Sequence, residues 1–207
     1  TIHAVTGFIN FAQGEFAMVA ALVAASLTAA GMPLALAVLV AVACSTLVGV
    51  LTERVAVQPV RRTSPLVVLV MTVAASTALR GVALLLWGTT PHGLPAFSAG
   101  PPVAFGAAVI SRQDLWVLGL TILAMAGLYM FFEHTVPGTA MRACADNLLA
   151  SRLVGVSPAT MSLLAFAVSA LLAGVAGAAV APITLATYDM GLMLGLKGFV
   201  AAVIGGL

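Results

Sequence analysis

The chain has 207 residues, 62% of them hydrophobic, with only eight basic and six acidic side chains. So few charges could hardly solvate the surface of a globular domain, which argues against a soluble protein. The net charge of +2 without a basic stripe argues against nucleic-acid binding, and two cysteines (Cys44 and Cys144) with three distant histidines indicate neither a disulfide framework nor a metal site.

The two ends of the chain predict a piece of a longer protein. The sequence starts at Thr1 without an initiator methionine and stops at Leu207 inside an apolar stretch. The residues that follow Lys197 are too few for a membrane crossing, which takes roughly 20 residues. We therefore expect residues 1–207 to be a single transmembrane domain that is truncated at both ends.

Five predominantly apolar runs follow one another along the chain. A helix rises about 1.5 Å per residue, so roughly 20 apolar residues cross the roughly 30 Å of bilayer hydrocarbon. The pattern predicts an all-α polytopic membrane protein, a transmembrane helical bundle with about five complete spans. The expected spans are Gly14–Ala30, which is short, Pro33–Thr52, Leu66–Trp87, Leu115–Phe132 and Pro158–Ala181, and a sixth begins near Lys197.

The arginines are unevenly divided among the loops between these runs. The segments 53–65 and 133–157 hold five of them, whereas segment 88–114 holds one. Two spans separate the two arginine-bearing segments, so both lie on one side, and the positive-inside rule places that side in the cytoplasm. Trp87 and Trp116 then lie at the outer interface, where aromatic side chains are favoured. The five arginines are Arg54, Arg61, Arg62, Arg142 and Arg152.

Two other segments are rich in Gly and Pro. Segment 88–114 is predicted to be an irregular external connection. Segment 182–197 is predicted to be an external or re-entrant stretch, which is tolerated at membrane depth only where protein or water covers its backbone.

Residues 138–158 form the most structured of the polar segments. Thr139 is suited to the N-cap of a helix, and Gly155 is suited to the position that ends one. Arg142 and Asp146 stand four residues apart and can pair on the helix surface. We expect one short amphipathic helix on the cytoplasmic face. It either receives a push from a partner protein or lies at the interface without a partner.

Two charged residues lie within the apolar runs. Glu15 follows Asn10 and Gln13 at the start of the first run. The three either line a polar vestibule or hold a broken helix against a neighbour, or else they form an ordinary interfacial cap. Arg80 lies roughly 10 Å below the outer interface, where a charge is costly and should face protein or water. It either belongs to the substrate pathway, meeting a substrate carboxylate or a partner such as Glu15 or Asp189, or has a structural role, which we favour.

Small residues recur at four-residue spacing in the fifth run, which favours close approach of helices. We expect these faces to pack within this chain rather than to form a subunit interface. They are Ala170, Gly174 and Ala178 on one side, with Ala173, Gly177 and Ala181 beside them.

Three motifs together resemble one known family. They are Asn10-Phe11-Ala12-Gln13-Gly14-Glu15-Phe16, then Met141-Arg142-Ala143-Cys144-Ala145-Asp146-Asn147 leading to Gly155, and Gly195-Leu196-Lys197-Gly198-Phe199 through Gly205-Gly206. Over essentially its whole length the chain resembles the branched-chain amino acid ABC transporter permease family. In the subunit type that it resembles most, histidine usually stands in the place of Gln13.

The resemblance implies that the loop at 138–157 is a coupling helix that docks into a groove on a separate nucleotide-binding subunit. Asp146 and Asn147 depart from the glutamate-alanine-alanine loop of other importers. The coupling residues carried over are Arg142, Ala145, Asp146, Asn147, Arg152 and Gly155. The residues assigned to the translocation pathway are Asn10, Gln13, Glu15 and Arg80.

The sequence itself indicates that ATP is bound and hydrolysed by another subunit. A P-loop needs the pattern Gly-x-x-x-x-Gly-Lys-Ser/Thr, and Lys197, the only lysine, does not stand in such a pattern. We expect no enzyme activity and no cofactor in this chain, with ATP and Mg bound by partner ATP-binding subunits. The other expected partners are a second permease subunit and an extracellular substrate-binding protein, in a bacterial or archaeal cytoplasmic membrane.

Three alternatives stay open. Permeases for urea or short amides are nearly the same in sequence as those for branched-chain amino acids. A self-contained secondary transporter or channel would need intramembrane acids or a filter, and the runs hold no acid except the marginal Glu15. A membrane-embedded enzyme would need a nucleophile beside a base, and neither Ser76 nor Ser162 has a histidine or carboxylate near it in sequence.

Overall fold

The computed structural model describes residues 10–60, 63–98, 100–105 and 108–205. Nearly all of its regular structure is helical, which confirms the all-α prediction. Arg61 and Arg62, two of the predicted cytoplasmic arginines, lie outside the described residues. The elements are α2 (Gln13–Ala29), α3 (Leu34–Thr52), the π-helix η1 (Glu53–Val57), the 3-10 helix η2 (Gln58–Val60), α4 (Pro65–Trp87), β1 (Val103–Phe105), β2 (Ala108–Ile110), α5 (Arg112–His134), α6 (Val136–Asp146), α7 (Leu148–Leu153), α8 (Pro158–Thr184) and α9 (Met190–Ile204).

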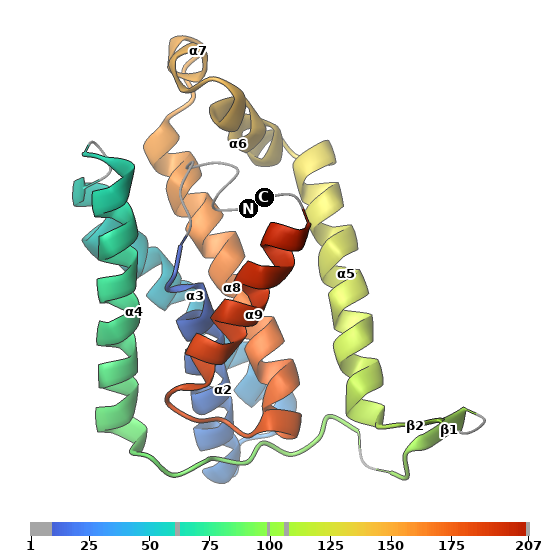
Figure 1. The fold of residues 1–207 in the computed structure, drawn as a ribbon. Coiled ribbons are helices and arrows are strands. Elements are labelled where there is room, and N and C mark those ends of the chain that lie inside the picture. Colours follow the sequence, from blue (N-terminus) through green and yellow to red (C-terminus); the bar gives the residue numbers. More distant parts are fainter. Residues whose placement is uncertain (1–9, 61–62, 99, 106–107, 206–207) are drawn as a thin grey trace.

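Four continuous helical stretches are long and apolar enough to cross a membrane, by length and composition. They are α3 continued through η1 and η2, α4, α5 and α8. The first predicted span, α2, has only 17 residues, in keeping with the short run in the sequence. The chain is a multi-pass membrane protein, and its long helices run side by side in Figure 1.

The core of the bundle consists of α2, α3 and α8, which pack against one another along much of their lengths. Small residues allow this close approach. A Cβ added at Gly49 would strike Ala170, and a Cβ added at Gly177 would strike the backbone of Ala17. The small-residue faces of α8 are therefore buried within this chain, as predicted. Their buried members are Ala170, Ala173, Gly174, Gly177, Ala178 and Ala181.

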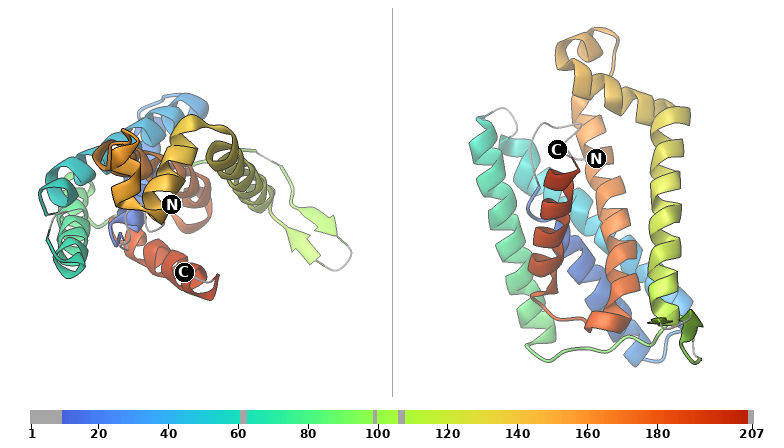
Figure 2. Two further views of the ribbon diagram at one scale, coloured as in Figure 1. Left: turned by 90° about the horizontal axis from the view of Figure 1, so that it is seen from above. Right: turned by 45° about the vertical axis from the view of Figure 1, so that its right-hand side comes forward.

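The helices α4 and α5 stand at the two sides of this core (Figure 1). Their large apolar side chains point mostly outward, as Leu85 on α4 and Leu123 on α5 do. Seen from above in Figure 2, the hairpin of β1 and β2 extends away from the bundle beside α5. The two strands pair antiparallel. The sequence suggested that segment 88–114 is irregular, and this hairpin shows that part of it is regular.

Two boundaries near the end of the chain differ from the prediction. The helix α8 continues through Pro182 to Thr184, so this proline removes one backbone donor without ending the helix. The helix α9 begins at Met190 rather than near Lys197. Gly191 and Gly195, which suggested a loop, instead let α9 cross α2 closely at Gly14.

The segment after α5 forms two helices, not the single one expected. The side chain of Thr135 accepts a hydrogen bond from Gly138 N at 3.1 Å, so Thr135 and not Thr139 is the N-cap of α6. Asn147 leaves helical geometry and caps α7, accepting from the backbone N–H of Leu149 and Ala150 at 3.1 and 3.0 Å. A polar residue that can bond its own backbone in this way divides the segment.

The pair α6–α7 lies at the same end of the bundle as the connection between α3 and α4 (Figure 1). The two arginine-bearing segments therefore share one side, as predicted. Trp87 and Trp116 belong to the opposite end, where α4 ends and α5 begins.

Candidate functional site

The helix α2 begins within the bundle and not at its edge. Gln13, its first residue, contacts Ser169, which lies near the middle of α8. A helix that starts at this depth exposes backbone N–H groups that need partners. The side chain of Asn10 supplies one by accepting from Ala12 N at 3.0 Å, and Phe11 N donates to the hydroxyl of Thr72 on α4 at 3.4 Å.

Gln13 holds α2 against α8 through two hydrogen bonds. Its Nε2 donates to the carbonyl oxygen of Ser169 at 2.9 Å, and the hydroxyl of Ser169 donates back to its Oε1 at 2.7 Å. On the other side, Gln13 and Asn10 line a small cavity of about 50 Å³ between the start of α2 and α9. The remaining lining residues are Phe11, Gly191, Leu192, Gly195, Leu196 and Phe199.

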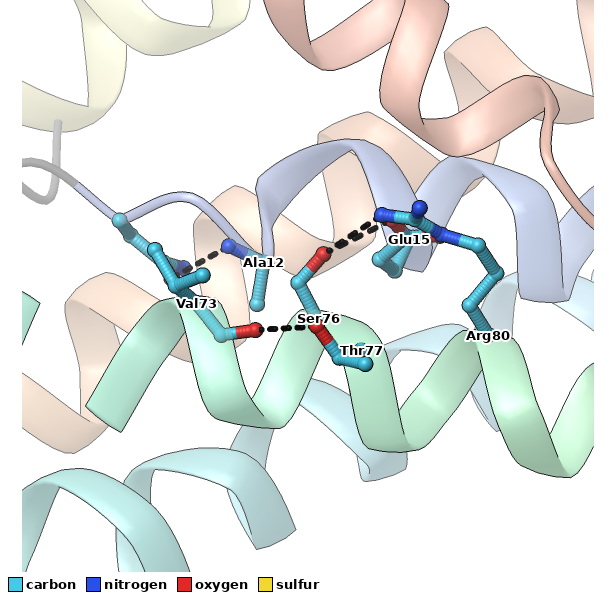
Figure 3. Close-up of polar contacts among 7 residues, drawn as sticks. Ala12, Glu15, Val73, Ser76, Thr77 and Arg80 are labelled. Carbon is cyan, nitrogen blue, oxygen red and sulfur yellow. Dashed lines mark hydrogen bonds and ion pairs between the residues drawn. The ribbon is translucent and has the colours of Figure 1, made fainter. Parts of the chain in front are cut away.

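Glu15 and Arg80 form an ion pair between α2 and α4 (Figure 3). Glu15 Oε1 accepts from Arg80 Nη2 at 3.1 Å and from the hydroxyl of Ser76 at 2.9 Å. Arg80 Nη2 also lies 3.3 Å from Ser76 Oγ. The side chain of Glu15 is 1% exposed and that of Arg80 is 27% exposed. Of the partners that the sequence suggested for Arg80, the structure thus shows an ion pair with Glu15.

The pair is incompletely hydrogen-bonded. Among the described residues, Glu15 Oε2 and Arg80 Nε are buried without a hydrogen-bond partner. Glu15 Oε2 faces Gly191 in the first turn of α9, where an added Cβ would strike it. The carboxylate is thus enclosed by α2, α4 and α9, and the missing side chain at Gly191 makes room for it.

The four predicted pathway residues therefore fall into two groups. Glu15 and Arg80 contact each other directly, whereas Asn10 and Gln13 line the neighbouring cavity. Gly191 belongs to both, since it lines the cavity and lies against the carboxylate. The arrangement places one anion, one cation and a small, largely apolar cavity beside each other at the start of α2.

Three buried polar residues were missed by reasoning from the sequence alone. Ser45 on α3 donates to the carbonyl oxygens of Phe16 and Ala170 at 2.7 and 3.1 Å, so it joins the three core helices. The other two donate hydrogen bonds to carboxylates. Ser76 donates to Glu15, and Ser162 donates to the fully buried Glu53 of η1 at 3.1 Å.

Neither Ser76 nor Ser162 has a carboxylate near it in sequence, as stated, but the fold brings one to each of them. That statement considered sequence neighbours only, and these partners are 61 and 109 residues away. In the described part of the chain, no group of three or more His, Cys, Asp or Glu side chains could hold a metal ion.

The predicted coupling residues lie on α6, on α7 and in the turn that follows. The residues Arg142, Ala145, Asp146, Asn147, Arg152 and Gly155 are all exposed. Arg142 does not pair with Asp146, as the spacing had suggested, but with Glu133 at the end of α5 at 2.9 Å. Because the chain turns sharply between α5 and α6, Glu133 becomes a closer partner than the next turn of α6. Gly155 has a φ of +85°, the left-handed conformation expected of a helix-ending glycine.

Comparison with known proteins assigns this architecture to a family. A family model described as the permease component of branched-chain amino acid transport systems matches residues 1–207. The chain belongs to this family. No solved structure matches it.

Two branched-chain amino acid permeases align with the whole chain, and an autoinducer 2 permease aligns with part of it. The branched-chain amino acid permease LivH of Salmonella typhimurium is 30% identical over 223 residues, which cover 100% of this chain and 71% of LivH. BraD of Pseudomonas aeruginosa is 30% identical over 220 residues, with 100% and 72% covered. The autoinducer 2 permease LsrC of an Enterobacter species is 35% identical over 130 residues, covering 60% of this chain and 36% of LsrC.

Proposed function

We propose that this permease belongs to an ATP-driven importer of branched-chain or other hydrophobic amino acids, and that it forms half of the translocation pore. The relatives LivH and BraD, which are named as branched-chain amino acid permeases, support the substrate class. The observation that best supports coupling to a separate ATPase is the exposed apolar surface of α7.

That surface consists of Leu149, Leu153 and Val154, which are 72%, 89% and 77% exposed. Leu149 and Leu153 lie on this short helix and Val154 directly follows it, at the arginine-bearing end, which the positive-inside rule assigns to the cytoplasm. Exposed apolar patches at such places are typical of protein interfaces. Only Val154 to Ser157 separate α7 from α8, so a protein that displaces α7 would also displace the central helix of the bundle.

In this proposal ATP and Mg bind to partner ATP-binding subunits, which contact the six coupling residues on α6, α7 and the turn after them. A second permease subunit completes the pore, and an extracellular binding protein delivers the substrate. The location is the bacterial cytoplasmic membrane. The substrate passes the region of Asn10, Gln13, Glu15 and Arg80, where polar groups and the small cavity meet at the start of α2.

The test is co-purification of the permease with its ATP-binding subunits. The double variant Leu149→Glu/Leu153→Glu should lower the yield of bound ATPase by at least about tenfold, the effect of losing one buried interface anchor. Membrane insertion should be unchanged, since both side chains are exposed and lie outside the predicted spans. The matched control is Val136→Glu at the first residue of α6, which is 85% exposed, lies outside the predicted spans and is not one of the six coupling residues; it should leave the yield intact.

Normal ATPase yield with the α7 variant would contradict the coupling assignment and would favour an interfacial helix without a partner. The transport part is tested by reconstituting the complete complex in proteoliposomes. Leucine delivered by the binding protein should stimulate ATP hydrolysis and be taken up. Stimulation of ATP hydrolysis by urea or acetamide in place of leucine would instead assign short amides as the substrates of this permease.

A further inference from the structure

The ion pair of Glu15 and Arg80 is unusual because it is buried and yet only half satisfied. Glu15 Oε1 accepts two hydrogen bonds, while Glu15 Oε2 and Arg80 Nε have no hydrogen-bond partner among the described residues. Buried polar groups are nearly always paired, and orphaned ones call for an explanation. An ion pair whose only role was to join α2 and α4 would gain no stability from leaving one acceptor and one donor without hydrogen bonds.

The two unused groups are one acceptor on the anion and one donor on the cation. The head group of an amino acid presents their complement, an ammonium that donates and a carboxylate that accepts. Resting on the proposed function, we propose that Glu15 and Arg80 form the binding site for this zwitterionic head. Glu15 Oε2 accepts a hydrogen bond from the α-ammonium, and the guanidinium of Arg80 donates to the α-carboxylate.

Charge balance at membrane depth favours this ligand over a simple anion or cation. The pair is electrically neutral, and so is a zwitterion, so binding adds no net charge to a region where net charge is expensive. An arginine also suits a carboxylate better than a lysine does, because its planar donors match the two oxygens.

The surroundings supply a place for an apolar side chain. Gly191 separates the carboxylate of Glu15 from the small cavity, whose apolar walls include Phe11, Leu196 and Phe199. In this structure α9 covers Glu15, whereas Arg80 remains partly exposed. Binding therefore requires α9 to move away from α2. Their crossing at Gly14, Gly191 and Gly195 has no side chains at these positions to interlock.

The proposal is tested by direct ligand binding to the purified complex of both permease subunits with the ATP-binding subunits, without the binding protein. The probes are leucine, leucinamide, which lacks the carboxylate, and 4-methylpentanoate, which lacks the ammonium. Calorimetry should show that the wild-type complex prefers leucine to each analogue by at least about tenfold, because each analogue leaves one buried charge unpaired.

Two single variants should remove this preference selectively. In Glu15→Gln, 4-methylpentanoate should bind at least as well as leucine, because the ammonium of leucine has lost its anionic partner, while leucinamide stays weak. In Arg80→Gln, leucinamide should bind at least as well as leucine, because the carboxylate of leucine has lost its cationic partner, while 4-methylpentanoate stays weak. The control is Thr77→Val on the same helix, an exposed residue whose hydroxyl bonds only Val73 O of its own helix in the described structure. This variant should keep the wild-type preferences.

A purely structural pair gives a different pattern, in which both single variants weaken all three probes by one common factor. That pattern, or a wild-type complex that binds leucine no better than its analogues, would overturn the proposal. If either single variant fails to assemble, Glu15→Gln/Arg80→Gln removes both charges together and should no longer prefer leucine to its analogues; a retained preference for leucine would again overturn the proposal. Leucine-stimulated ATP hydrolysis in the wild-type complex, measured after the binding protein is added, shows independently whether the proposed function stands.

Discussion

The inner helices and the outer helices of this permease are held in different ways. The helices α2, α3 and α8 approach until small residues touch backbone, as Gly177 does at Ala17. The outer helices α4 and α5 are also predominantly apolar, yet many of their large apolar side chains are exposed. Their ties include polar contacts: the ion pair of Arg80 with Glu15 for α4, and Gln113 for α5, whose Nε2 donates to Ala179 O at 2.7 Å.

The difference shows which features hold helices together in a membrane. Lipid chains are as apolar as leucine, so an apolar surface alone does not drive association there. Close packing of small residues and specific polar contacts do. The outward faces of α4 and α5 are therefore not defects of packing, and substitutions should act very differently in the two regions.

The largest expected effect distinguishes two glycines in the middle of helices. Gly177→Leu places a side chain where even a Cβ would come within 2.7 Å of Ala17 Cα. The unfolding free energy, measured by SDS titration in mixed micelles, should fall by about 3 kcal/mol, the upper part of the range for overpacked cores. Gly127→Leu on α5 is the control, since a Cβ there meets no described atom within 4 Å. Its unfolding free energy should stay within about 0.5 kcal/mol of the wild type, as is usual for exposed sites.

Equal losses at Gly177 and Gly127 would contradict the division into a packed core and loosely held outer helices. A loss at Gly127 in the complete complex, but not in the isolated chain, would instead locate a subunit contact on that face of α5.

The same division explains which features were predictable from the sequence. The long spans were predicted well because bilayer thickness fixes the length of an apolar helix, whatever packs against it. The start of α9 was not, because Gly191 and Gly195 look like helix breakers until Gly14 of α2 is known to lie against them. The partner of Arg142 was wrong for a similar reason. Helical spacing favoured Asp146, whereas the turn between α5 and α6 brings Glu133 closer.

The residues of the candidate site that could be predicted are those whose placement in a membrane costs much free energy. Charges within apolar runs singled out Glu15 and Arg80, since an ionised group at that depth needs a partner. Ser45 and Ser76 gave no such signal, because a serine in a membrane helix can bond the backbone of its own helix. Only the arrangement of the helices shows that both bridge to other helices instead.

A smaller effect is expected at the polar contact of the core. Ser45→Ala removes the hydroxyl that donates to Phe16 O and Ala170 O. The unfolding free energy should fall by about 1 kcal/mol, within the range found for hydrogen bonds between membrane helices. The matched variant is Thr121→Val on α5, whose hydroxyl donates to Val117 O in its own helix and is exposed. That variant should change the free energy by less than about 0.5 kcal/mol. If the Thr121 change proved the more costly, hydrogen bonding between helices would not distinguish the core.

The smallest effect is expected at the ion pair of Glu133 and Arg142, which the sequence did not predict. Both side chains are nearly half exposed, at 45% and 48%, so water and salt screen their attraction. Glu133→Gln should lower the unfolding free energy by no more than about 0.5 kcal/mol, and molar salt should abolish even that difference. The turn between α5 and α6 should survive, because Thr135 still caps α6 and Gly138 still packs on Phe131. A loss as large as that of Gly177→Leu would show that this turn is part of the rigid core, and that α5 is held more firmly than its exposed surface indicates.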